Sequence, residues 1–237
     1  VRKPKMKRMS PLALVLALAV VAAAGAEELR FGMNEDARDE LKFTSRAPLE
    51  QITGRAAKIR GSIAIPDSTQ LLGDSVAAWF EVDLTSIDTG IELRNAHMRD
   101  RFLQTSLYPT ATLRLREVVG AVVADDADPD GVRSVSALEP GAPTRLSIVG
   151  TFRVHGEERE IQIDNLTVTH FPASDDTKGV RPGDLLTVKG SFAISLDDYR
   201  IVRPRALFLR LSDRLEVEFH MTAAAGIVAP SPSPFQE

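Results

Sequence analysis

The chain has 237 residues, of which 43% are hydrophobic, with 29 Lys and Arg against 33 Asp and Glu and no cysteine. The absence of cysteine excludes a disulfide-stapled fold and a thiol nucleophile, so the fold must rest on its own hydrophobic core. The acidic balance argues against nucleic acid and against an electrostatic grip on an anionic membrane surface as partners.

The first 26 residues have the features of a secretory signal peptide. "VRKPKMKRM" is basic, "PLALVLALAVVAAA" is apolar, and "AGA" before Glu27 has the small-x-small form of a cleavage site. The apolar run is short for a bilayer span, and no later stretch approaches the roughly 20 apolar residues that a span needs. We therefore expect a periplasmic or secreted protein, cleaved near Ala26, with no membrane span in its mature form. The remaining 24 basic and 33 acidic residues give that form a net charge of −9.

Alternation of apolar and polar residues recurs after the leader, and this is the period of half-buried strands. The predicted strands, in chain order, lie near 29–34, 41–45, 57–65, 80–87, 111–117, 146–156, 159–171, 186–196 and 215–223. Strands with one polar face form antiparallel sheets, and closing such a sheet removes its edges. We therefore predict an all-β fold over 27–223, an antiparallel barrel of about eight strands whose lumen is filled or holds one slender ligand.

Between the strands near 80–87 and 111–117, helical spacing predicts a short amphipathic helix over Leu93 to Leu103, ended by Tyr108 and Pro109. We expect this helix to act as a lid at one end of the barrel, with Met98 and Phe102 facing the lumen. Arg94, His97 and Arg99 are then available to the polar end of a ligand. Alternatively, its basic residues only pair with the acidic residues Asp88, Glu92 and Asp100.

Two polar loops, 124–144 and 172–184, are predicted later in the chain, followed by a disordered Pro- and Ser-rich tail over 224–237. The cluster "DDADPD" in the first loop lacks the residue spacing of a calcium-binding loop, so we favour a solvated hairpin loop and expect no metal site. No other cofactor is indicated.

Three strands place a glycine in their apolar register, at Gly61, Gly150 and Gly190. One interpretation is that these glycines allow the strands to coil and bend, as barrels require. The other is that the missing side chains leave an apolar channel in the lumen. The two interpretations are compatible.

An enzymatic function needs a nucleophile held beside a base, or a metal. The four histidines, at 97, 155, 170 and 220, show no metal-ligand spacing, and there is no GxSxG motif. His97 with Asp88 or Asp100 is the only candidate acid–base pair, and no nucleophile accompanies it. We therefore expect no catalytic residues and no enzymatic activity.

The block "VDLTSIDTGIELRNAHMRDRFLQTSLYPTATL", followed by "GTFRVHGEEREIQI" and "GSFAISLDDYRI", resembles the YceI-like family of exported bacterial proteins. The resemblance implies a lipocalin-like barrel that binds a polyisoprenoid lipid in an elongated apolar lumen, without catalysis. We therefore expect a carrier or sequestering protein for an isoprenoid-type lipid, a polyprenyl compound or a quinone. The alternative is an interaction or stress-related barrel with a filled core, or, less favoured, an exported enzyme that uses the His97 cluster.

The predicted lumen residues are the apolar members of the strand and helix registers. They are Phe80, Val82, Leu84, Met98, Phe102, Leu113, Leu115, Ile148, Phe152, Val154, Val188, Phe192, Ile194, Val217 and Phe219. The sequence makes no prediction of oligomeric state.

Overall fold

The computed structural model describes residues 28–35, 39–47, 50–125, 128–203, 205–206, 209–210, 212–229 and 231–232. The predicted signal peptide, 1–26, lies outside these residues. In chain order the elements are β1 (Leu29–Met33), β2 (Glu40–Ala47), β3 (Glu50–Ala56), β4 (Ile59–Ile65), β5 (Ala77–Asp83), η1 (Leu84–Ser86), α1 (Glu92–His97), η2 (Met98–Phe102), β6 (Thr110–Asp125), β7 (Asp128–Ser134), β8 (Thr144–Val154), β9 (Glu157–Phe171), α2 (Asp175–Lys178), β10 (Leu185–Ser195), η3 (Asp197–Tyr199), β11 (Arg205–Ala206), β12 (Leu209–Arg210) and β13 (Arg214–Ala225).

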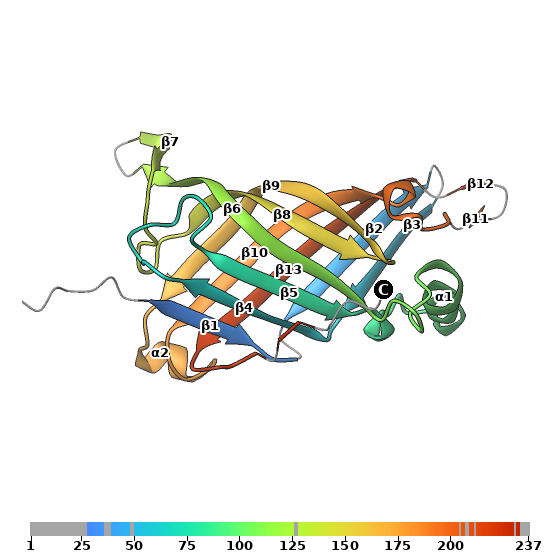
Figure 1. The fold of residues 1–237 in the computed structure, drawn as a ribbon, viewed down its shortest axis with the longest axis horizontal. Helices are drawn as coiled ribbons and strands as arrows, with labels where there is room; N and C mark the ends of the chain where they lie inside the picture. The colour runs from blue at the N-terminus through green and yellow to red at the C-terminus, as the bar shows by residue number, and fades with distance from the viewer. Residues whose placement is uncertain are drawn as a thin grey trace, which may run out of the picture.

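Eight antiparallel strands close into a barrel, as predicted (Figure 1). Their order is β1-β4-β5-β6-β8-β9-β10-β13, and β13 pairs back onto β1. Inward residues alternate with outward ones along the strands; in β8, for example, every second residue is buried. The apolar register therefore forms one continuous core inside the barrel.

Strand β13 has two successive neighbours along one edge. Residues 215–220 pair with β2, whereas Ala224 and Ala225 pair with β1. Between these two ladders, Thr222 has no strand partner on that edge of β13. The buried ion pair of Asp39 and Arg181 bonds its backbone instead. The Thr222 N–H donates to Asp39 Oδ1 over 2.8 Å, and Arg181 Nη1 donates to the Thr222 carbonyl over 2.6 Å. The pair thus satisfies the backbone N–H and carbonyl of Thr222 at the point where β13 changes its neighbouring strand.

The β2–β3 hairpin continues the wall of the barrel beyond β1. The free edge of β3 meets the turn before α1, where Arg55 and Asp88 exchange two backbone hydrogen bonds of 2.9 Å each. This single bridge closes the wall beside α1.

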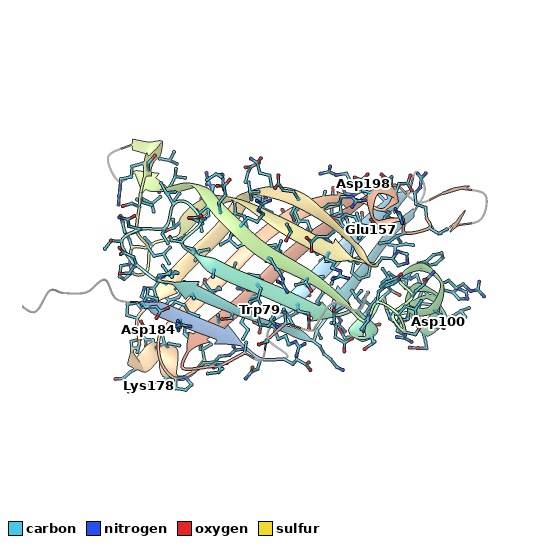
Figure 2. The ribbon with its side chains drawn as sticks, in the orientation of Figure 1. Trp79, Asp100, Glu157, Lys178, Asp184 and Asp198 are labelled. Atoms are coloured by element: carbon cyan, nitrogen blue, oxygen red, sulfur yellow. The ribbon has the colours of Figure 1, made fainter. Side chains whose placement is uncertain are left out.

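The two ends of the barrel carry different caps (Figure 1). Helix α1 and η2 lie at one end, and α2 and the β6–β7 extension lie at the other. In Figure 2, Asp100 marks the α1 end, Lys178 and Asp184 mark the α2 end, and Trp79 lies on the wall between them. Among the described residues, no helix has the length and apolarity needed to cross a membrane.

Several segments differ from the sequence prediction: α2 lies in the predicted loop 172–184, β6 runs to Asp125, and β11 and β12 were not predicted. Residues 50–56 form β3, although only one strand was predicted between 45 and 65. The loop predicted at 124–144 contains β7, which pairs with the end of β6; Asp126 and Ala127 in its acidic cluster lie outside the described residues. Strand β13 runs to Ala225, two residues into the predicted tail, because Ala224 and Ala225 pair with β1. Residues 230 and 233–237 of that tail lie outside the described residues.

The glycine-channel interpretation is wrong, because neighbouring atoms occupy the space beside all three glycines. A Cβ at Gly61 would lie 2.7 Å from the Phe80 ring, and one at Gly190 would lie 2.8 Å from the Phe219 ring. At Gly150 it would lie 2.6 Å from the backbone carbonyl of Arg114. The glycines therefore allow rings and strands to approach closely, the role that glycines in sheets commonly have.

Candidate functional site

An apolar cavity of about 410 Å³ occupies the α1 end of the barrel. Its volume lies within the range of roughly 300–1,000 Å³ that is typical of small-molecule sites. All but three of its lining residues are apolar; the exceptions are Ser45, Arg94 and His97. The lining residues are Leu41, Phe43, Ser45, Ile52, Ala56, Val82, Leu84, Ile87, Ile91, Leu93, Arg94, His97, Met98, Phe102, Leu103, Ala111, Phe152, Val154, Ile194, Leu196, Ile201, Leu215 and Val217.

The turn before α1 is held by a network of polar side chains. Asp88 Oδ1 accepts hydrogen bonds from the Gly90 N–H (2.8 Å) and from the Asn95 amide (3.1 Å), and these bonds hold the pKa of Asp88 below its ordinary value. Asn95 is 4% exposed, and its Oδ1 accepts from both the N–H and the hydroxyl of Thr89. Gly90 has φ of 75°, a backbone conformation that favours glycine. The acidic and amide groups of this motif therefore seat the helix.

The helical segment lies over the cavity, as predicted for the lid. Met98 and Phe102 line the cavity from η2, four residues apart on one face. Ile91 and Leu93 also line it, yet they are 52% and 68% exposed. These two residues therefore mark the mouth of the cavity, where the apolar lining reaches solvent.

An aromatic cluster lies between the cavity and a smaller interior space. Phe152 lines the cavity, and its ring packs edge-on against Phe192 at 5.2 Å, which in turn lies 6.3 Å from Phe219. The three rings line a space of about 40 Å³, and a space of about 60 Å³ lies in the α2 half of the barrel. Of these three spaces, the cavity at the α1 end is the one with the volume of a ligand site.

All fifteen predicted lumen residues line an interior space, but not the same one. Phe192 and Phe219 line the space of about 40 Å³, together with Phe80, Leu113, Val82 and Phe152. The space of about 60 Å³ in the α2 half is lined by Phe80, Leu113, Leu115, Ile148 and Val188. The large cavity is lined by Val82, Leu84, Met98, Phe102, Phe152, Val154, Ile194 and Val217.

The three predicted head-group residues are separated by the structure. Arg94 and His97 line the cavity. Arg94 donates from Nε to the Thr89 hydroxyl and from Nη2 to the Thr89 carbonyl, both over 2.9 Å. Arg99 does not line the cavity; its guanidinium lies 2.8 Å from Glu92 on the same helical segment. Arg99 thus makes the acidic pairing that was the alternative prediction for this helix.

The four histidines lie in four different surroundings. His97 lines the cavity, His155 packs against Tyr108, His170 bonds Asp184 over 3.0 Å, and His220 lies on the exposed face of β13. Within the described part of the chain, no three His, Cys, Asp or Glu side chains are close enough together to hold a metal ion. The Asp88 carboxylate, a proposed partner of His97, is instead bonded to Gly90, Asn95 and, at 3.5 Å, Arg55.

The β2–β3 hairpin supplies lining residues that sequence reasoning missed. Leu41, Phe43 and Ser45 occupy alternate positions of β2 and line the cavity, opposite Ile52 of β3. The alternation in "LKFTS" indicated that these three residues share one face. Because the third of them is a serine, the segment was predicted only as a weak strand and its residues were not assigned to the lumen. Other lining residues outside the prediction are Ala56, Ile87, Ile91, Leu93, Leu103, Ala111, Leu196, Ile201 and Leu215.

A closed eight-stranded antiparallel barrel with an apolar lumen and a short helix over one end defines a lipocalin-like barrel protein. Within this class, the chain belongs to the YceI-like domain family, whose model matches residues 34–223. Among curated proteins, none matches the chain significantly.

Several solved structures share this fold. A polyisoprenoid binding domain from Saccharophagus degradans superposes with a TM-score of 0.57 at 21% identity, over 84% of this chain and 99% of that domain. BcnA from Burkholderia cenocepacia gives a TM-score of 0.55 at 14% identity, over 79% and 98% of the two chains. A mutant YceI protein from Campylobacter jejuni gives 0.50 at 13% identity, over 77% and 90%. At these identities the likeness establishes the fold.

Proposed function

We propose that this protein binds an isoprenoid-type lipid, a polyprenyl compound or a quinone, in the cavity at the α1 end. The observation that carries the proposal is the cavity itself, about 410 Å³ of largely apolar space under the helical lid. Each methylene group buried there contributes roughly 0.8 kcal/mol. An aliphatic tail is therefore held without any specific polar contact.

Family membership supports this function. The chain belongs to the YceI-like domain family, and a solved structure with the same fold is described as a polyisoprenoid binding domain. The cavity in this chain has the chemistry that such a ligand requires, because branched hydrocarbon chains are best accommodated by Leu, Ile, Val, Phe and Met side chains.

We propose binding rather than catalysis as the biochemical role. Asp88, one of the two carboxylates considered as an acid–base partner of His97, is bonded to Asn95, and Asn95 is bonded to Thr89. They hold the lid in place, and none of these three residues lines the cavity. His97 does line it, without a carboxylate partner among the described residues.

The biological role that we propose is carriage or sequestration of the lipid after export to the periplasm or the medium. The basis for export is the leader-like sequence of residues 1–26. Apolar residues at the mouth, Ile91 and Leu93, give a lipid tail an apolar path into the cavity.

The test is to purify the protein from the extracellular or periplasmic fraction of a bacterial host, extract it with organic solvent and analyse the extract by mass spectrometry. We expect an isoprenoid lipid in near-stoichiometric amount, and an intact protein mass that corresponds to cleavage after Ala26. A retained leader contradicts the proposed export. A clean extract from protein that also fails to bind added isoprenoid contradicts lipid binding and favours the filled-core alternative, to which the packed middle of the barrel already conforms.

A further inference from the structure

One hydroxyl group faces the apolar cavity with no hydrogen-bond partner among the described residues. Ser45 lines the cavity from β2 and is 4% exposed, and its Oγ makes no hydrogen bond within the described chain. A buried hydroxyl left unsatisfied is costly, and most buried polar groups in proteins therefore have a partner. Ser45 thus needs a reason to occupy this position.

The residues that the strand pairing places beside Ser45 are apolar. Its cross-strand neighbours are Leu215 on β13 and Ile52 on β3, and both line the same cavity. The preceding inward residue of β2 is Phe43, whose ring lies across Gly54. Neither cross-strand neighbour has a donor or acceptor in its side chain, and among the described residues Ser45 Oγ has no partner, so its position favours a partner that enters the cavity.

Other buried polar atoms without a partner do not share this setting. Among the described residues they include the hydroxyls of Thr144 and Tyr199 and the Nε2 of His155, none of which lines the cavity. Burial raises the pKa of Tyr199 to about 12, and its ring packs against Phe152 at 5.6 Å. Ser45 is therefore set apart by facing space that a ligand can fill.

We propose that Ser45 is a specificity-determining residue, whose hydroxyl bonds a neutral oxygen, a carbonyl or a hydroxyl, of the lipid in the cavity. This inference rests on the proposed function. A neutral oxygen suits this position because it exchanges one hydrogen bond with Oγ, whereas the cross-strand neighbours Leu215 and Ile52 offer an ionised phosphate no opposite charge. The cavity thus selects lipids by a polar atom as well as by their tails.

The experiment compares two C15 probes of one carbon skeleton: farnesol, which has a hydroxyl, and farnesene, which has none. Affinities are measured by displacement of Nile red, because the single tryptophan, Trp79, lies on the barrel wall and does not line the cavity (Figure 2). We expect Ser45→Ala to weaken farnesol binding about three- to tenfold, the effect of one hydrogen bond, and to change farnesene binding less than twofold. Ser45→Thr, which keeps the hydroxyl, should restore the preference for farnesol.

A second readout separates ligand recognition from a structural role. Since Ser45→Ala removes an unsatisfied buried hydroxyl, it should raise the melting temperature of the lipid-free protein by about 2–4 °C. The matched control is Ser191→Ala, because Ser191 lies on the outer register of β10 and bonds Asn165; it should alter neither probe.

Two negative results have different meanings. If wild-type protein binds farnesol and farnesene equally tightly, or if Ser45→Ala changes the binding of both probes to the same extent, the role of Ser45 is overturned while lipid binding stands. If the wild-type protein binds neither probe, the proposed function fails, and this inference fails with it.

Discussion

Phe192→Glu should unfold the barrel or abolish lipid uptake. The partly buried Phe192 ring lies between Phe152 and Phe219 and lines the interior space of about 40 Å³. Truncation of a fully buried Phe typically costs about 3–5 kcal/mol, and here a carboxylate with no partner against an apolar interior adds to the loss of packing. A loss of this size removes much of the stability of an ordinary domain. The measurement is the free energy of unfolding in urea, followed by circular dichroism.

The matched control is Lys189→Glu, three residues earlier on β10 and on its exposed face. It should change the free energy of unfolding by less than about 0.5 kcal/mol, as surface substitutions usually do. The control should still have a measurable local effect. Burial is the main cause that lowers the pKa of His220, and the positive charge of Lys189 is the second, so reversing that charge should raise the pKa. Equal destabilisation at the two positions would contradict the assignment of Phe192 to the inner face and Lys189 to the outer face of β10.

Arg181→Met should destabilise the protein by about 3–5 kcal/mol. The Arg181 and Asp39 side chains are 7% and 0% exposed, with 3.3 Å between Nη2 and Oδ2. Removal of the guanidinium leaves a buried carboxylate beside Thr222 and takes one hydrogen bond from the Thr222 carbonyl. The measurement is urea unfolding of the single variants Arg181→Met and Asp39→Asn and of the double variant.

The double variant should be more stable than the sum of the single losses predicts, because neither Asp39 nor Arg181 is then left as a buried charge without the other. Arg46→Ala is the control for a surface pair: Arg46 lies 2.9 Å from Glu216, but its side chain is 62% exposed. That variant should lose less than about 1 kcal/mol. Similar losses for Arg181→Met and Arg46→Ala would contradict the structural role of the buried pair.

Local periodicity was sufficient to predict the barrel and the parity of its strongest strands. In β8, β10 and β13 the apolar residues alternate strictly, and the structure places Phe152, Phe192 and Val217 on the inner wall. The helical segment over 92–102 was also predicted, because Met98 and Phe102 recur at helical spacing and Pro109 ends the pattern. These features depend only on neighbours in sequence.

Features that depend on distant residues were not predictable in this way. Asp39 and Arg181 are separated by 142 residues, and nothing near either one in sequence indicates its partner. Strand β3 was missed because its segment, "EQITGRA", is short and polar, and its pairing is supplied by β2 and by Asp88. The channel interpretation of the glycines failed for the same reason, since the atoms that occupy the space beside them come from other residues, such as the Phe219 ring beside Gly190.

The aromatic cluster limits the length of hydrocarbon chain that the proposed lipid site can hold. Phe152 lines the cavity and packs against Phe192, and the adjoining space is only about 40 Å³, so a tail bound as proposed would gain binding free energy only until the cavity is full. At roughly 0.8 kcal/mol for each buried methylene, we expect affinity to rise steeply with the first isoprene units and then to level off. On the proposed function, a lipid longer than the cavity would leave its remaining length outside, past Ile91 and Leu93. Such a lipid would stay partly within reach of a membrane or a second protein while bound.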